Sequence, residues 1–427
     1  MRNARLAVLA ILVAFLPTGA SPAGERAGVH AAITYYVSAA GNDATGTPDD
    51  PARPYRSPRG AFLDIPSDLT LGAGDHVIQF TDSTVYGQLT ITPKVTDPAH
   101  RVILRAADGA TPVMDAYSTA DGSPGRAVNN PALRILASHV VVEGLRFTNT
   151  SPDTSILGSE VMVRLDGSHV VIQGNHFDGN SRQPTTTDMF LLICNGAAEN
   201  VIAGNRFDFS GGKSLIHVSA SCGGGSPGRQ VIRNNALSRF GNNPQRICAA
   251  INFGGSRGTL AGDNSVVENN TIYDNGGACY GLLNTNTSAV TVRNNIFANI
   301  TGHRFAIGCS GVGGSSSGVA YHSVMHGNTN DVESTCGSGG WTLREVYTDD
   351  PHFVNPGATP PDLHVQSTAG SRRNGTGAWI IDTRCSVAID KAPASDAFGA
   401  EPSPNGGRRN LGAYGNTSEA SKSCTRD

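Results

Sequence analysis

A short segment recurs along the middle of the chain, and this repeat limits the folds that are possible. Its copies begin His139-Val-Val-Val-Glu-Gly-Leu-Arg-Phe, His169-Val-Val-Ile-Gln-Gly-Asn-His-Phe and Glu199-Asn-Val-Ile-Ala-Gly-Asn-Arg-Phe, with looser copies from Arg229, Asn264 and Ala289. The anchor positions are Gly144, Gly174, Gly204, Asn234, Asn269 and Asn294, separated by 30, 30, 30, 35 and 25 residues. Self-similarity at this period indicates an array of stacked units.

Each copy predicts a short strand that ends in a tight turn, because four or five mostly apolar residues are followed by Gly or Asn. One position after the anchors stand Leu145, Asn175, Asn205, Asn235, Asn270 and Asn295. Asparagine tolerates left-handed backbone angles and bonds locally to backbone, so it suits such a bend. In coils stacked at ~4.8 Å, we expect these asparagines to bond to one another as a ladder.

A second column lies three positions after the anchors: Phe147, Phe177, Phe207, Leu237, Ile272 and Phe297. We expect these large apolar side chains to stack in the interior. Another apolar run precedes each copy, for example Met162-Val-Arg-Leu-Asp and Phe190-Leu-Leu-Ile-Cys. Two or three short strands in each repeat describe one coil of a parallel β-solenoid.

This pattern resembles the right-handed parallel β-helix of the pectate-lyase-like superfamily, and the handedness is implied by that resemblance. We therefore expect an all-β, right-handed parallel β-helix with roughly 25–35 residues per coil and caps at both ends. Residues 32–130 would form the N-terminal cap and first coils, 131–335 the body, and 336–427 the last coils and C-terminal cap. The run Glu401-Pro-Ser-Pro-Asn-Gly-Gly-Arg-Arg-Asn-Leu-Gly-Ala-Tyr-Gly-Asn-Thr is similar to the terminal segment of many bacterial β-helix proteins.

The chain begins with a charged start, Met1-Arg-Asn-Ala-Arg, and an apolar stretch from Leu6 to Leu16 that is too short to span a bilayer. Small residues follow, so residues 1–23 are expected to be a secretory signal peptide of a bacterial extracellular protein. No other membrane segment is expected. The net charge of -3 gives no reason to expect a nucleic-acid partner, and a monomer is expected.

The chain has eight cysteines and no pair with the spacing of a zinc site. An even number in an exported chain indicates disulfides. Sequential pairing would link Cys194 to Cys222, Cys248 to Cys279, Cys309 to Cys336 and Cys385 to Cys424. Eight cysteines nevertheless permit 105 connectivities.

Enzymes of this superfamily mostly cut acidic polysaccharides, by hydrolysis or by β-elimination. Hydrolysis needs two carboxylates at a defined separation, and the paired-aspartate motif of polygalacturonase-like enzymes is absent. β-Elimination needs a cation that neutralises the uronate carboxylate and a base that removes the neighbouring proton. We therefore expect a polysaccharide lyase, with Lys213 or His217 as the base and Arg164 stabilising the enolate.

Other residues of the same strands could line one groove. Asn195, Asn252 and Asn284 stand at roughly equivalent places and are expected to bind substrate, and Asp166 and Asp188 are candidate Ca²⁺ ligands. Gly212-Lys213-Ser214 resembles a lysine-containing segment of the chondroitinase B and alginate lyase family, but the acidic metal ligands that precede it there are missing. These roles therefore rest on position alone. The alternatives are a non-catalytic extracellular protein that binds glycans or forms a structure, and a glycoside hydrolase.

Overall fold

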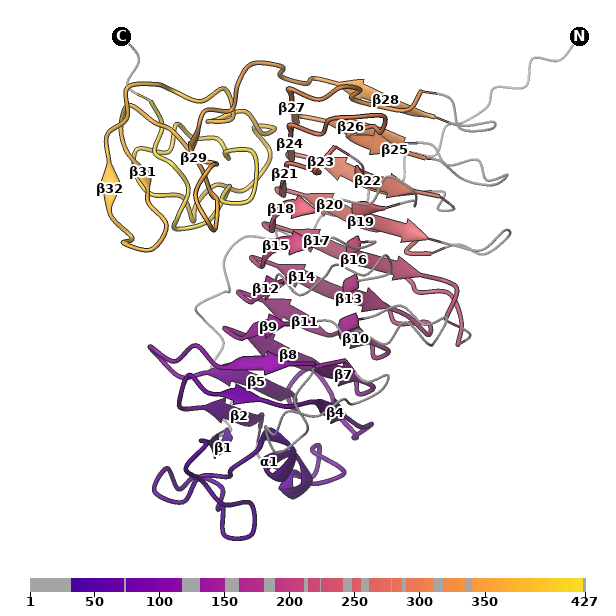
Figure 1. Ribbon diagram of the computed structural model, residues 1–427, viewed down its shortest axis with the longest axis vertical. Coiled ribbons are helices and arrows are strands. Elements are labelled where there is room, and N and C mark those ends of the chain that lie inside the picture. The colour runs from indigo at the N-terminus through magenta and orange to yellow at the C-terminus, as the bar shows by residue number, and fades with distance from the viewer. Residues whose placement is uncertain are drawn as a thin grey trace, which may run out of the picture.

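Three long parallel sheets form the body of the protein in a computed structural model (Figure 1). The structure describes residues 32–72, 74–116, 131–149, 161–179, 189–210, 214–222, 224–240, 248–254, 261–277, 279–285, 289–309, 318–334 and 340–424. Every strand of these three sheets pairs in parallel with the strands of the coils before and after it, which is the geometry of a right-handed parallel β-helix. The fold class expected from the repeat is confirmed.

The three sheets follow one another around each coil. The eight-strand sheet contains β4 (Leu89–Ile91), β7 (Leu133–Ile135), β10 (Val161–Leu165), β13 (Met189–Ile193), β16 (Ser214–Ser219), β19 (Ala249–Gly254), β22 (Tyr280–Asn284) and β25 (Ile307–Gly308). The eleven-strand sheet contains β1 (Ile33–Val37), β2 (His76–Phe80), β5 (Val102–Ala106), β8 (Val140–Glu143), β11 (Val171–Gln173), β14 (Asn200–Ala203), β17 (Gln230–Arg233), β20 (Val266–Glu268), β23 (Thr291–Arg293), β26 (Gly318–Tyr321) and β28 (Trp341–Arg344). The nine-strand sheet contains β3 (Val85–Tyr86), β6 (Val113–Asp115), β9 (Arg146–Thr148), β12 (His176–Asp178), β15 (Arg206–Ser210), β18 (Ala236–Phe240), β21 (Thr271–Tyr273), β24 (Ile296–Ala298) and β27 (Val324–His326).

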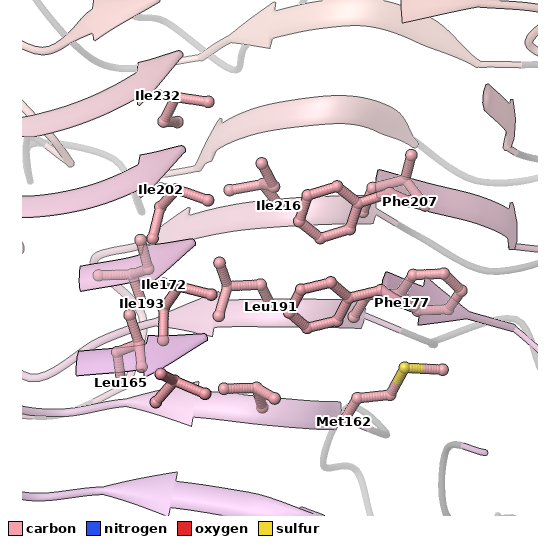
Figure 2. Close-up of a cluster of buried hydrophobic side chains, with 14 of the residues drawn as sticks. Met162, Leu165, Ile172, Phe177, Leu191, Ile193, Ile202, Phe207, Ile216 and Ile232 are labelled. Atoms are coloured by element: carbon pink, nitrogen blue, oxygen red, sulfur yellow. The ribbon is translucent and has the colours of Figure 1, made fainter. Parts of the chain in front are cut away.

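The core is a set of stacked columns, because residues of the same type occupy the same register in successive coils. The rings of Phe147, Phe177 and Phe207 stack with centroids 5.0 and 4.4 Å apart, and Leu237 continues the column in register. Figure 2 shows Phe177 and Phe207 beside the aliphatic columns of the other two sheets. All of these side chains are buried, so the predicted apolar stack is confirmed.

The predicted asparagine ladder is also present, at the corner between the eleven-strand and nine-strand sheets. The Nδ2 of Asn175 donates to Oδ1 of Asn205 at 3.1 Å, and the same bond links Asn205 to Asn235 at 3.0 Å. It continues through Asn270 to Asn295 at 3.0 and 3.1 Å. Each of these donors also bonds to a backbone carbonyl of the coil before, so the buried amides are satisfied within the fold.

Additional elements flank the sheets at both ends of the described chain. Helix α1 (Pro58–Asp64) packs against β1 and β4, with Ser57 as its N-cap. The C-terminal region, defined here as residues 345–424, contains β29 (Phe353–Asn355), β30 (Asp362–Val365), β31 (Ser371–Arg372) and β32 (Trp379–Ile380). It packs beside the later coils on the nine-strand sheet (Figure 1), where Leu363 and Leu411 share an apolar cluster with Ile296 and Val324. No helix in the described ranges is long and apolar enough to cross a membrane.

Three of the expected disulfides lie in described residues and follow the sequential pairing. They join Cys194 to Cys222, Cys248 to Cys279, and Cys385 to Cys424. Cys309 is also disulfide-bonded. The first two bonds connect segments of neighbouring coils beside the eight-strand sheet. The signal peptide expected over residues 1–23 lies outside the described residues, as does Cys336.

Candidate active site

One column of the eight-strand sheet carries the polar side chains that the sequence singled out. In register from coil to coil it contains Arg134, Arg164, Leu192, His217, Asn252 and Leu283. The neighbours of Arg164 on its own strand, Val163 and Leu165, belong to the core. Because side chains alternate along a strand, the column points away from the core. Arg164 and His217 therefore both lie on the outer face of the sheet.

The column begins with two arginines held by one buried carboxylate. Nε of Arg134 donates to Asp166 Oδ2 at 2.9 Å, and Nε of Arg164 donates to Oδ1 at 2.9 Å. Nδ2 of Asn195 donates to the same Oδ1 at 2.6 Å. The Asp166 side chain is 4% exposed, while those of Arg134 and Arg164 are 36% and 26% exposed. The guanidinium groups are therefore oriented from behind and remain partly open to solvent.

This arrangement suits binding of an anion. Asp166 engages both arginines through Nε, the nitrogen nearest the side-chain stem. The terminal nitrogens of a guanidinium are the donors that take a carboxylate, and two such groups one coil apart are ~4.8 Å apart at the backbone. Among these described side chains, two arginines and one aspartate together carry one net positive charge. A uronate carboxylate is a ligand of the matching charge and size.

The same contacts argue against Asp166 as a calcium ligand. Its two oxygens already accept bonds from two guanidinium groups and one amide, whereas Ca²⁺ requires six to eight oxygen ligands with free lone pairs. Within the described ranges, no group of three or more His, Cys, Asp or Glu side chains could hold a metal ion. Asp188, the other candidate ligand, lies outside the described residues. Calcium remains a prediction, and no step below depends on it.

The next coil along the column is apolar. Leu192 forms a buried cluster with Val161, Met189 and Cys194, and Cys222 packs against it through the disulfide. This cluster lies on the outer face of the sheet, separate from the main core. It places a hydrophobic step between Arg164 and His217, which are two coils, or about 10 Å of backbone, apart.

His217 and Asn252 are neighbours across the β16–β19 pairing, and both are buried, with 4% and 3% of their surface exposed. A Cβ added at Gly254 would lie 2.7 Å from Nε2 of His217. Glycine therefore makes room for the imidazole ring. Asn252 Nδ2 reaches Ser214 Oγ at 3.5 Å. This part of the face is a buried polar cluster that contains a histidine, a side chain that can act as a general acid or base.

The three candidate asparagines do not occupy equivalent places. Asn252 is in the outward column, but Asn284 is in register with Phe253 in an inward column and is fully buried. Asn195 follows the end of β13 and supports Asp166. The expected equivalence of Asn195, Asn252 and Asn284 is therefore wrong, because the strand phase places Leu283 beside Asn252. Lys213, the other candidate base, lies outside the described residues.

Arg134 is a member of this site that the sequence analysis did not identify. Its strand, Leu133-Arg134-Ile135, has the same alternation as Val163-Arg164-Leu165 one coil later, and the two arginines are in register. Aligning these two triplets would have revealed the pair. The first recognised repeat begins at His139, so Arg134 lies in a strand that precedes the repeats.

The described strands resemble those of several solved β-helix structures, while no family model and no curated protein matches the chain. A pectate lyase, Pel9A, is 15% identical with a TM-score of 0.42, covering 89% of this chain and 95% of its own. XylC in complex with xylose is 10% identical with a TM-score of 0.46, covering 71% of this chain and 70% of its own. An alginate lyase from Paenibacillus sp. is 14% identical with a TM-score of 0.34, covering 66% and 93%.

These identities and TM-scores are low, so the fold assignment rests on the three parallel sheets and the coil-to-coil register of the chain itself. Those features make this protein a right-handed parallel β-helix.

Proposed function

We propose that this chain is a carbohydrate-active β-helix protein that binds an acidic polysaccharide on the outer face of the eight-strand sheet. The observation that carries the proposal is the pair Arg134–Arg164, held by the buried carboxylate of Asp166 with both guanidinium groups partly exposed. A pre-oriented pair of this kind loses little conformational freedom when it binds a carboxylate. The similar solved structures include a pectate lyase and an alginate lyase, which fits a uronate-containing ligand.

The reaction we propose is β-elimination. A uronate carboxylate bound by Arg164 and Arg134 loses part of its charge, which makes the proton on the adjacent carbon more acidic. A base, Lys213 or His217, removes that proton, and the bond from the next carbon to the glycosidic oxygen breaks. The electron pair of the C–H bond forms the new double bond, and the leaving oxygen takes up a proton. The products are a new chain end and an unsaturated uronate.

A non-catalytic glycan-binding protein is the second candidate, and one observation favours it. In β-elimination the carboxylate and the abstracted proton belong to one sugar ring, so the cation and the base must lie close together. Arg164 and His217 are instead separated by the Leu192 coil. Binding needs only the arginine pair, whereas catalysis also requires a base that reaches the sugar ring across the Leu192 coil.

The test uses the full chain with pectate, alginate and glucuronan, following the ultraviolet absorbance of an unsaturated uronate. We expect Lys213→Ala or His217→Ala to lower the rate by about 10²–10⁴-fold, the usual contribution of a general base. Arg164→Gln and Arg134→Gln are expected to weaken polysaccharide binding at least tenfold, each leaving one guanidinium beside Asp166. Arg229→Gln is the matched control, because Arg229 is an exposed arginine paired with Glu199 in the connection that leads to the eleven-strand sheet.

Binding that depends on Arg164 without an unsaturated product would support the glycan-binding candidate. Binding and turnover that are equal in the wild type, Arg164→Gln and Arg134→Gln chains would exclude the proposed face altogether.

A further inference from the structure

A second polar groove lies at the corner between the eleven-strand and nine-strand sheets, away from the eight-strand sheet. It has a volume of about 710 Å³, and the exposed backbone of Gly144, Gly174 and Gly204 forms its floor. One wall comes from the sheet and the other from the C-terminal region. The first wall carries the side chains of Glu143, Gln173 and Arg233, and the second wall carries those of Asn416 and Thr417.

The glycines of the floor are not required by the backbone. Gly144, Gly174 and Gly204 have φ values of 71°, 62° and 64°. The equivalent residues of the next three coils, Asn234, Asn269 and Asn294, adopt φ values of 55°, 52° and 58°. A Cβ at Gly174 would meet nothing within 4 Å, and at Gly204 its nearest neighbour would be 3.9 Å away. Glycine at positions 174 and 204 therefore keeps the groove open, whereas a Cβ at Gly144 would lie 3.3 Å from Cβ of Ala106.

The walls offer the groups that recognise hydroxyl-rich ligands. Gln173 Nε2 donates to Glu143 Oε2 at 2.8 Å, which holds a carboxylate and an amide side by side. Arg233 stands in the same register two coils after Gln173, half-buried at the end of the groove. A carboxylate accepts from sugar hydroxyls and a guanidinium donates to them.

The floor does not suit an added peptide strand. The backbone N–H groups of Gly174 and Gly204 already donate to Ala203 and Arg233, at 3.2 and 3.1 Å. Strand addition needs free N–H groups along an edge, and these two donors are used between coils. A ligand that is recognised through its hydroxyl groups has no such requirement. The coil repeat of ~4.8 Å also allows one sugar residue of an extended chain to face each coil.

We propose that this groove is a second carbohydrate-binding site, which takes an extended oligosaccharide over the three glycines. The inference rests on the carbohydrate ligand class proposed above, but it uses no residue of the eight-strand sheet. One function of such a site is to hold a polymer at a distance from the first face, so that a single chain is bound twice. Bivalent binding of this kind raises the overall affinity without new contacts at either site.

The test fills the groove without straining the backbone. In the double variant Gly174→Asn/Gly204→Asn, each new asparagine takes the positive φ that Asn234, Asn269 and Asn294 already have in this protein. The probes are hexasaccharides of galacturonate, mannuronate and xylose, titrated calorimetrically against an Arg164→Gln chain so that the first face contributes little. We expect the filled groove to bind the preferred hexasaccharide at least tenfold more weakly, with an unchanged or slightly raised melting temperature.

Two further variants keep the outcome specific. Gly375→Asn is the matched control, because Gly375 also has a positive φ, of 80°, with nothing near its Cβ, and does not line the groove. It should bind like the parent chain. Arg233→Ala should weaken binding as the filled groove does.

The proposal is overturned if the filled groove binds every probe as tightly as the parent, or if no probe binds the Arg164→Gln chain at millimolar concentration. Product formation separates the two proposals. Suppose that the Gly174→Asn/Gly204→Asn protein loses binding while neither it nor the wild-type protein forms an unsaturated product. That result would support the second binding site and contradict the proposed lyase reaction.

Discussion

The corner between the eleven-strand and nine-strand sheets is built in two ways within one molecule. The anchor position is Gly144, Gly174 and Gly204 in the first three repeats, and Asn234, Asn269 and Asn294 in the next three. All six residues have a positive φ, between 52° and 71°. The backbone therefore accepts either residue type, and the choice between them has another cause.

Asparagine replaces glycine at the anchor position in the coils that contact the C-terminal region. Asn234 Nδ2 donates to the backbone oxygens of Ala413 and Gly415, and Asn269 Nδ2 to those of Asn410 and Gly412. Asn294 Nδ2 bonds to Asp396 Oδ2 at 2.6 Å. The three asparagines thus fasten the terminal segment to the coils, while the three glycines leave the groove described above. In a repeat protein, a change of residue type at one repeated position can therefore mark where a new contact begins.

The asparagine ladder runs through both halves and should respond equally in each. We expect Asn205→Ala in the glycine half and Asn270→Ala in the asparagine half to lower the free energy of unfolding by about 2–5 kcal/mol, since each leaves several buried partners unsatisfied. Urea denaturation of the two variants measures this. A loss confined to one half would show that the ladder is not the shared element of the two corners.

Exchange of the anchor residues should have unequal effects. Asn269→Gly removes two donors to the terminal segment and the acceptor of Arg409 Nη1, at 3.0 Å. We expect a loss of about 2–3 kcal/mol and faster amide hydrogen exchange in residues 410–416. The reverse change in the open corner, Gly204→Asn, should alter stability by less than about 1 kcal/mol. Equal effects would mean that residue type at the anchor is set by the backbone after all.

The attachment of the terminal segment should also depend on pH through Glu401. Its Oε1 accepts from the backbone N–H groups of Asn410 and Asn416, at 2.8 and 2.6 Å, and its Oε2 is buried without a partner. Burial is the main cause that raises the pKa of Glu401 to about 7. The two backbone N–H groups and the Arg409 guanidinium oppose this rise, and the neighbouring Asp390 adds to it. The unpartnered Oε2 is the oxygen that can carry the proton while Oε1 keeps both bonds.

A carboxyl whose pKa is higher in the folded than in the unfolded state contributes most to stability at low pH. That contribution is lost as the pH rises from the unfolded value, about 4.5, through about 7. We expect the free energy of unfolding to fall by about 2–3 kcal/mol between pH 5 and pH 8. Glu401→Gln cannot ionise and should remove this slope, as urea denaturation across that range will show. A slope that persists in the variant would assign the dependence to another group.

Much of the fold could be predicted because the repeat is written directly in the sequence. The ladder asparagines and the apolar column recur at fixed offsets from the anchors. Residues at the same offset therefore occupy the same place in successive coils. The residues on the outer face of the eight-strand sheet were harder to predict. A shift of one residue along a strand turns its side chains to the opposite face and changes which residues share a column. Matching asparagines by type placed Asn284 beside Asn252, although Leu283 holds that place. Nor does a sequence show that Asp166 is already occupied by two arginines and an amide.

The connection between the eleven-strand and nine-strand sheets has a constant length, and this limits where segments can be inserted into the chain. Two residues always separate the eleven-strand sheet from the nine-strand sheet in the ladder coils, as Gly174 and Asn175 do between β11 and β12. The other two connections absorb all the variation in coil length, from 25 to 35 residues, while the ladder bonds stay at 3.0 and 3.1 Å. New segments could therefore be grafted into the connection that leads to the eight-strand sheet without shifting any strand out of alignment. The outer face of the eight-strand sheet could then be altered one coil at a time.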